Sequence, residues 1–269
     1  MALQRVGLRH PRVRAALATA KSSAAGPSPY LVVEGTWAHE RLLATGTQAE
    51  TFLWCPDATR TERARDCAGR MCEQATAAYE ISAKVLARLS EREKPDGLVS
   101  LARLPRWDVE AWKFGESALV LVADGIEYAG NLGTLIRTAD ACRADCLLLV
   151  NRRVRLTHRR VFGASRGTVL STPVLEFGSG TDAAAWLARH RFEVILADPR
   201  ADRSYRDCAY RGPRTAVVVG SEGRGPSREW SERNVTAVSI PMLGSADSLN
   251  VATSAAVLLF EARACHAGW

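Results

Sequence analysis

The sequence predicts an α/β protein, with a mostly parallel sheet in its second part and a smaller α/β unit in front of it. Short, continuous apolar runs alternate with helix-like segments after residue 116, which is typical of parallel sheets that helices cover on both faces. Of the 269 residues, 47% are hydrophobic and 24% are charged, as in globular chains that bury a core. The composition excludes a mainly disordered chain, and the length suits one large domain or two modest ones.

Residues 1–105 form the first expected domain, in which strand-like and helix-like segments alternate. The expected strands are 30–34, 51–55 and 98–104, and the expected helices are 38–44 and 75–90. The last strand follows a turn-prone sequence, Lys94-Pro95-Asp96-Gly97. A linker is expected over residues 106–116, where Trp107 and Trp112 stand among charged residues.

The second expected domain covers residues 117–269. Its expected strands are 118–123, 146–150, 194–197, 216–219 and 238–240, and its expected helices are 133–142, 181–190 and 248–264. Ligands of such sheets collect in the loops at the carboxyl ends of the strands, so the functional residues are expected there.

The composition also predicts the cellular compartment of the protein and argues against a membrane span and a metal site. No uncharged apolar run approaches the roughly 18 to 20 residues of a membrane span, so we expect a soluble protein without a membrane partner. The seven cysteines are odd in number and never spaced C-x-x-C, which favours reduced thiols in the cytoplasm. No histidine grouping suits a metal, and we expect none.

Basic residues predict a polyanionic partner. Lys and Arg number 36 against 29 Asp and Glu, a net charge of +7. Arginines cluster in two places, the N-terminal residues 1–14 and the stretch from Arg152 to Arg166. Such residues can neutralise the phosphates of a polyanion such as RNA, and a solvated basic surface is the alternative. The N-terminal cluster is interpreted as a basic arm, with a mitochondrial transit segment as the alternative.

The first of three loops of interest, residues 124–140, follows a buried-type strand and opens a helix. Its glycines allow close backbone approach, and Asn131 can act as a helix cap. Arg137 lies on the first turns of that helix. Taken alone, the pattern N-x-G-x-x-x-R also suits a capped helix with an arginine in solvent.

The second loop, residues 219–227, carries Gly220, Gly223 and Gly225 directly after an apolar strand. The spacing is neither G-x-G-x-x-G nor that of a P-loop. Glu222 would repel a nucleotide phosphate, although Arg224 partly offsets it, so the loop suits a cationic or neutral ligand better. A simple tight turn is the alternative.

The third loop, residues 240–252, leads into a helix rich in Ala and Leu. Asp247 or Ser248 can cap that helix, which would place Asn250 inside an apolar first turn. An asparagine there is either satisfied by a neighbouring loop or holds a ligand.

Together, the order and spacing of these loops resemble the three motifs of the SpoU or TrmH-like branch of the SPOUT superfamily. The matching residues are Asn131, Gly133 and Arg137; Gly220, Ser221, Glu222 and Gly225; and Pro241, Ser248, Leu249 and Asn250. The resemblance covers about residues 117–264. The first domain is similar to the ribosomal-protein-like substrate-binding domain that often precedes the catalytic one.

The resemblance implies an enzyme that transfers a methyl group from S-adenosylmethionine (AdoMet) to an RNA ribose 2′-hydroxyl. It also implies a C-terminal trefoil knot, which nothing in the periodicity predicts, and a homodimer formed through the knotted domain. Because a guanidinium is a poor general base, Arg137 is expected to orient the hydroxyl and the adjacent phosphate.

Residue roles follow from the same resemblance. The expected catalytic residues are Arg137, Asn131, Glu222, Ser248 and Asn250. The expected cofactor-binding residues are Ala197, Gly220, Ser221, Gly225, Ile240, Met242, Ser248, Leu249 and Asn250. The expected RNA-binding residues are Arg137, from the resemblance, and Arg9, Arg12 and Arg166, from the two basic clusters.

The target RNA is less narrowly defined. Residues 159–174 resemble the corresponding part of the thiostrepton-resistance type of 23S rRNA methyltransferase, which favours 23S rRNA and leaves both antibiotic resistance and a housekeeping role open. Transfer RNA is the alternative substrate. An inactive RNA-binding protein and a nicotinamide-dependent oxidoreductase are the alternative classes; the second would need a G-x-G-x-x-G that Gly130-Asn-Leu-Gly133 does not supply.

Overall fold

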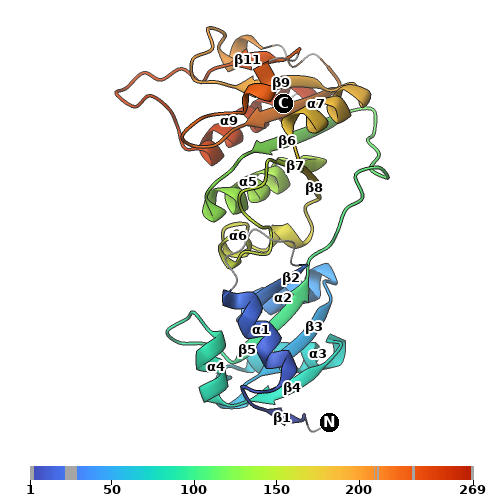
Figure 1. Ribbon diagram of the computed structural model, residues 1–269, viewed down its shortest axis with the longest axis vertical. Coiled ribbons are helices and arrows are strands. Elements are labelled where there is room, and N and C mark those ends of the chain that lie inside the picture. Colours follow the sequence, from blue (N-terminus) through green and yellow to red (C-terminus); the bar gives the residue numbers. More distant parts are fainter. Residues whose placement is uncertain (1–2, 22–28, 209, 211, 232–233, 268–269) are drawn as a thin grey trace. The chain divides into compact units, whose positions relative to one another are not determined.

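The computed structural model describes residues 3–21, 29–208, 210, 212–231 and 234–267 of the chain (Figure 1). Contacts between residues divide the chain into two compact units. One comprises Met1–Pro105 with Thr157–Arg159, and the other comprises Arg106–Leu156 with Arg160–Trp269. No helix in the described ranges combines the length and the apolar character that crossing a membrane requires.

The first unit contains a mixed sheet in the strand order β1-β4-β3-β5-β2. Its elements are β1 (Arg5–Val6), α1 (Pro11–Lys21), β2 (Tyr30–Glu34), α2 (Thr36–Thr45), β3 (Ala49–Trp54), α3 (Glu62–Gln74), β4 (Ala78–Ile81), α4 (Ala83–Leu89) and β5 (Leu98–Arg103). Strand β4 runs parallel to β1 and β3, whereas β5 runs antiparallel to β2 and β3. The three strands expected from the sequence are found, together with the helix between the first two.

The helix expected over residues 75–90 is wrong in its first half. Residues Ala78–Ile81 form strand β4, and only Ala83–Leu89 are helical. Pairing with β1 on one side and β3 on the other decides the conformation, since it satisfies the backbone and overrides the helical propensity of the alanines. Ser82 then begins the helix by accepting a hydrogen bond from the Val85 amide.

The residues interpreted as a basic arm also differ from expectation. Arg5 and Val6 pair with Glu80 and Ile81 as strand β1, and α1 begins at Pro11. Val13 and Ala16 of α1 are fully buried in the core of the first unit. The basic segment is therefore a folded part of this unit, which presents Arg9 and Arg12 on its surface.

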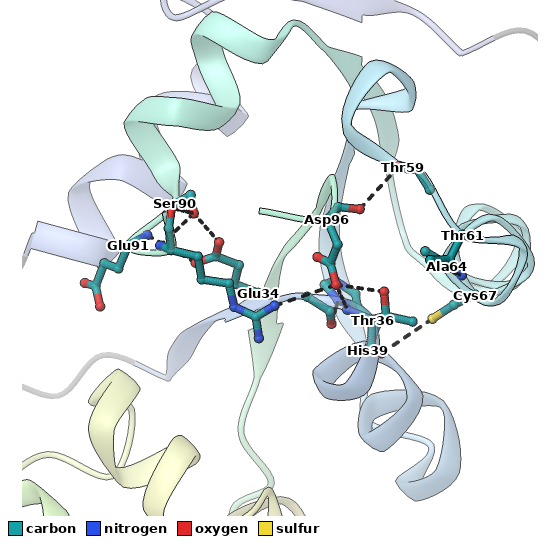
Figure 2. A network of polar contacts seen from close by, with 12 residues as sticks. Glu34, Thr36, His39, Thr59, Thr61, Ala64, Cys67, Ser90, Glu91 and Asp96 are labelled. Carbon is teal, nitrogen blue, oxygen red and sulfur yellow. Dashed lines mark hydrogen bonds and ion pairs between the residues drawn. The ribbon is translucent and has the colours of Figure 1, made fainter. Parts of the chain in front are cut away.

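The turn at Lys94–Gly97 fastens the start of α2 (Figure 2). Because the residue before α2 is Gly35, no side chain there can cap the helix. Asp96 caps the helix instead, because its carboxylate accepts hydrogen bonds of 2.8 Å from both the amide and the hydroxyl of Thr36. Gly97 has φ +89°, and a Cβ there would lie 2.4 Å from the Thr59 hydroxyl, so the turn requires glycine.

The second unit contains a six-stranded sheet in the order β11-β9-β10-β6-β7-β8, in which every pairing is parallel. Its elements are β6 (Ala118–Asp124), α5 (Ala129–Ala141), β7 (Cys146–Val150), α6 (Arg159–Ala164), β8 (Val174–Phe177), α7 (Gly180–Arg189), β9 (Glu193–Ala197), β10 (Arg214–Val219), α8 (Arg228–Ser231), β11 (Thr236–Val238) and α9 (Val251–Ala267). The predicted parallel sheet is confirmed.

Burial on both faces explains why the strands have no polar alternation. Val120 and Val122 of β6 belong to the cluster around Trp186 of α7, while Leu119 and Leu121, pointing to the opposite face, are equally inaccessible. Helices α5 and α9 pack against each other, as Figure 1 shows, and α9 also packs against β6 and β10. Strand β8 and the short helices α6 and α8 were not predicted, since their sequences are too short for a periodic signal.

Candidate functional site

Three side chains from distant parts of the sequence are joined by hydrogen bonds at the carboxyl edge of the parallel sheet. Asn131 Nδ2 donates to Glu222 Oε1 at 2.5 Å, and Asn250 Nδ2 donates to Asn131 Oδ1 at 3.2 Å. These residues come from the loops after β6, β10 and β11. The predicted convergence of the three loops is confirmed.

Glu222 sets the orientation of the Asn131 amide. A carboxylate only accepts hydrogen bonds, so it must face the Nδ2 group, and this leaves Oδ1 to accept from Asn250. Asn131 itself lies in the first turn of α5, which begins at Ala129 with Tyr128 in the capping position. The expectation that Asn131 caps the helix, with a start near Gly133, is therefore wrong.

Asn250 directly precedes α9 and caps its first turn. Its Oδ1 accepts a hydrogen bond of 2.9 Å from the Ala252 amide, and its backbone carbonyl accepts from Ser254. Asp247 and Ser248 do not cap the helix as expected, because it starts at Val251; the Ser248 hydroxyl donates to Asp247 instead. One asparagine amide therefore both caps α9 and holds the first loop.

The loop after β10 is a tight turn that presents Glu222. Ser221 and Gly225 exchange two backbone hydrogen bonds of 3.1 and 2.9 Å across its neck. A Cβ on Gly220 would lie 1.9 Å from the Pro226 nitrogen, and Gly225 has φ +70°. Both positions require glycine for backbone reasons, which accounts for the spacing that fits neither nucleotide motif.

Close packing also explains why residue 133 of the first motif is glycine. A Cβ there would lie 2.6 Å from the Val161 carbonyl oxygen and 2.9 Å from the Ser165 nitrogen. Helix α5 can therefore approach the segment around α6 only because residue 133 has no side chain.

Arg137 lies exposed on α5 and is not part of the hydrogen-bonded chain. Within the described ranges it forms no ion pair, so its guanidinium is available to a ligand. Arg166 is also exposed and has φ +52°. Arg9 and Arg12 lie in the first unit.

The residues expected to bind the cofactor follow three adjacent strands, β11, β9 and β10. Ala197 ends β9, Gly220 and Ser221 follow β10, and Ile240 and Met242 follow β11. The chain from residue 243 to 250 is exposed, with Leu249 37% accessible. Backbone groups, small residues and apolar side chains therefore lie at this edge.

Asp124 is a further residue of the site that the sequence analysis did not select. It is buried at the end of β6 and accepts hydrogen bonds from Asn151 Nδ2 (2.8 Å), the Ser227 amide (2.7 Å) and Trp230 Nε1 (3.1 Å). These donors fasten the loops after β7 and β10 to β6. An acid that ends an otherwise apolar seven-residue strand was the signal that could have found it.

The comparison with protein families decides the identity. The profile of the SpoU rRNA Methylase family matches residues 118–260, more than half of the chain. The chain belongs to this family. Its predicted assignment to the SpoU branch, and to RNA methyltransferases, is confirmed. The profile of the MRM3-like substrate binding domain matches residues 28–100 of this SpoU-family protein.

Relatives and solved structures agree with the assignment. The 23S rRNA (adenosine(1067)-2′-O)-methyltransferase of Streptomyces azureus is 32% identical over 186 residues, 67% of each chain. A crystal structure of an RNA 2′-O ribose methyltransferase superposes with a TM-score of 0.78 at 32% identity, covering 97% of this chain and 98% of that one. The SpoU methyltransferase AviRb from Streptomyces viridochromogenes, in complex with AdoMet, shares the fold, with a TM-score of 0.82 at 23% identity over 97% and 100% of the two chains.

Proposed function

We propose that this protein transfers the methyl group of AdoMet to a ribose 2′-hydroxyl of 23S rRNA. The observation that carries the proposal is the hydrogen-bonded chain Glu222–Asn131–Asn250, which assembles three family motifs at one edge of the sheet. The relative from Streptomyces azureus, which acts on 23S rRNA by its name, favours this RNA. The MRM3-like match and the net charge of +7 support an RNA substrate in general.

AdoMet, when bound, supplies an electrophilic methyl group on a positively charged sulfur. Ala197, Gly220, Ile240, Met242 and Leu249 are proposed to hold it by backbone groups and apolar contact. Glu222 would place a negative charge near the sulfonium-binding edge, which favours a cationic ligand over a phosphate.

The chain's own contribution to the reaction is alignment. The Asn131 amide is fixed by hydrogen bonds on both of its polar atoms, so it is preorganised before a substrate arrives. Ser248 and Asn250 hold the third loop beside it. Arg137 is proposed to bind the phosphate next to the target ribose and to aim the 2′-hydroxyl at the methyl group, because a guanidinium donates several hydrogen bonds but is a poor base.

Three finer features are proposed with the function. Residues 1–105 would form the RNA substrate-binding domain, and residues 117–269 would form the catalytic domain. Residues 106–116 would be the linker between these two domains. The C-terminal segment would form a trefoil knot; helix α9, which returns to pack against β6, β10 and α5, supports this. Two copies would form a homodimer through that domain, for which the exposed Phe260 on α9 offers an apolar contact.

The test is transfer of tritium from labelled AdoMet to total RNA, followed by separation of 23S rRNA from tRNA and mapping of the modified nucleotide. Label at one ribose of 23S rRNA is expected. Label in tRNA would replace the proposed substrate by the alternative one. RNA binding without label, by a protein that binds AdoMet in calorimetry, would favour an inactive RNA-binding protein and contradict the proposal.

The cellular role can be tested separately. We propose a cytoplasmic enzyme whose product protects the ribosome from thiostrepton. Expression in a sensitive bacterial host should raise the drug concentration that stops growth; an unchanged value, with methylated rRNA, would favour a housekeeping modification.

A further inference from the structure

A second feature of the carboxyl edge lies between the first two motif loops and the loop after β7, and its arginine side chains have no role in the function described so far. A hollow of about 510 Å³ opens between the loops after β6, β7 and β10. Ser221 and Gly225, which close the neck of the Glu222 loop, form one wall. The hollow therefore adjoins the side of that loop away from β9 and β11, where the cofactor is proposed to lie.

Three arginine side chains line the hollow without forming an ion pair to a described residue of the protein. Arg153 comes from the loop after β7, and Arg224 and Arg228 come from the segment after β10. All three are exposed, and in the part of the chain that the structure describes none of them forms an ion pair. The neighbouring Arg152 differs, since it is paired with Glu176 at 3.0 Å.

Most of the carboxylates around the hollow are already engaged. Asp124 accepts hydrogen bonds from three donors of the protein. Glu229 accepts from the Thr181 amide at 2.9 Å, at the start of α7. These bonds leave Asp124 and Glu229 charged, but they direct oxygens of both carboxylates toward donors of the protein. The three exposed guanidinium groups lining the hollow can therefore donate hydrogen bonds to an anion, with Glu127 as the one carboxylate there without a described partner.

A second hollow continues the same edge. It has a volume of about 480 Å³, lies at the ends of β7 and β8, and shares Asn151 and Arg153 with the first. An extended, repeating anion could thus lie across both. An RNA strand has this form, because its phosphates repeat at regular intervals along the backbone.

We infer that the hollow holds a second backbone phosphate of the RNA, in addition to the one assigned to Arg137, near the nucleotide whose ribose is placed at Glu222 and Asn131, with Arg153 and Arg224 as its ligands. This inference rests on the proposed function and names the path of the substrate: the strand leaves the reaction site across the ends of β10, β6, β7 and β8. Arg153 and Arg224 thereby fix which ribose along the strand reaches the cofactor.

The test measures binding of a fluorescent single-stranded oligouridylate by anisotropy over a range of salt concentrations. Arg153→Gln and Arg224→Gln should each weaken binding about fivefold. Each should also lower the slope of log affinity against log salt by about 0.7, the contribution of one phosphate contact on a single strand. Glu127→Gln should strengthen binding, because it removes the opposing charge.

The matched control is Arg189→Gln. Arg189 is likewise exposed and unpaired within the described ranges, but it ends α7 at the opposite edge of the sheet. Its replacement should change neither affinity nor slope. Equal effects of the three arginine variants, or an unchanged slope for Arg153→Gln and Arg224→Gln, would overturn the inference. Displacement of the oligouridylate by inorganic phosphate at constant ionic strength would assign the hollow to a small anion instead.

Methyl transfer to rRNA by the wild type separates this inference from the proposed function. If the wild type methylates rRNA and both variants bind RNA as tightly as the wild type, only the phosphate site is refuted. A wild type that binds no RNA refutes both. AdoMet affinity of the variants, measured by calorimetry, should equal that of the wild type, and a loss there would contradict a role confined to RNA.

Discussion

Asn131 and Glu222 are 91 positions apart, yet Asn131 Nδ2 lies 2.5 Å from Glu222 Oε1. The bond joins the first turn of α5 to the loop after β10, and these elements follow strands β6 and β10, which are neighbours in the sheet. Adjacent parallel strands end at the same edge, so the sheet itself brings the two side chains together. Asn250 then completes the chain from the third loop.

Replacing Arg137 by alanine should lower methyl transfer about 100-fold or more, because the target hydroxyl loses the group that aims it. AdoMet affinity should change little, since Arg137 lies outside the edge formed by β9, β10 and β11. Single-turnover rates and calorimetry measure the two effects. Unchanged turnover would exclude the proposed role, and a parallel loss of AdoMet affinity would place the guanidinium at the cofactor.

Two substitutions of Asn250 should separate its roles. Asn250→Ser keeps an oxygen that can cap α9 but cannot reach Asn131 as an amide does, so we expect near-normal stability and reduced turnover. Asn250→Ala loses both bonds, and its free energy of unfolding should fall by a further ~1 kcal/mol. Urea denaturation and initial rates provide the comparison. Equal stability of the two variants would show that the cap contributes nothing.

Gly220→Ala should disrupt the turn that presents Glu222, since the added Cβ would lie 1.9 Å from the Pro226 nitrogen. A cost of about 1 to 3 kcal/mol in unfolding free energy is expected for such overpacking, with weaker AdoMet binding. Gly223→Ala in the same turn is the control, because nothing lies within 4 Å of its Cβ position. If both variants bind AdoMet equally well, the close approach at Gly220 is irrelevant to the site.

Stability should fall as the pH drops from about 6.5 to 4, in part because of His39. Burial lowers the pKa of His39 from 6.5 to about 4, and the ring bonds the Gly35 carbonyl and Ser100 hydroxyl. The unfolded chain takes up the proton near pH 6.5 while the native state stays neutral until about pH 4. Stability from this group is thus complete above pH 6.5 and is lost as the pH falls, by an amount on the order of 3 kcal/mol.

The variant His39→Gln should have a flatter pH dependence over this range. Burial also lowers the pKa of His190 and His266, so only the difference between wild type and variant reports on His39. Denaturant unfolding at several pH values measures it. Identical slopes for the two proteins would mean that His39 does not remain neutral in the native state.

Much of the second unit could be predicted from the sequence because its strands are continuous apolar runs. A strand buried on both faces, such as β6, leaves a signal that no exposed element imitates. The segment over residues 75–90 shows the opposite case. Its alanines favour a helix, but pairing with β1 and β3 overrides that propensity and makes Ala78–Ile81 a strand.

The candidate site likewise combines features that the sequence predicts with features that only the structure shows. The sequence by itself determined the three loops, the family and the residue types that meet there, because motif spacing is a local property of the chain. Only the tertiary structure decided that Asn250 caps α9, that Asp124 fastens the loops after β7 and β10 to β6, and that Arg153 and Arg224 line the same hollow. Those relationships depend on which strands are neighbours, and strand order arises from long-range packing that no local pattern encodes.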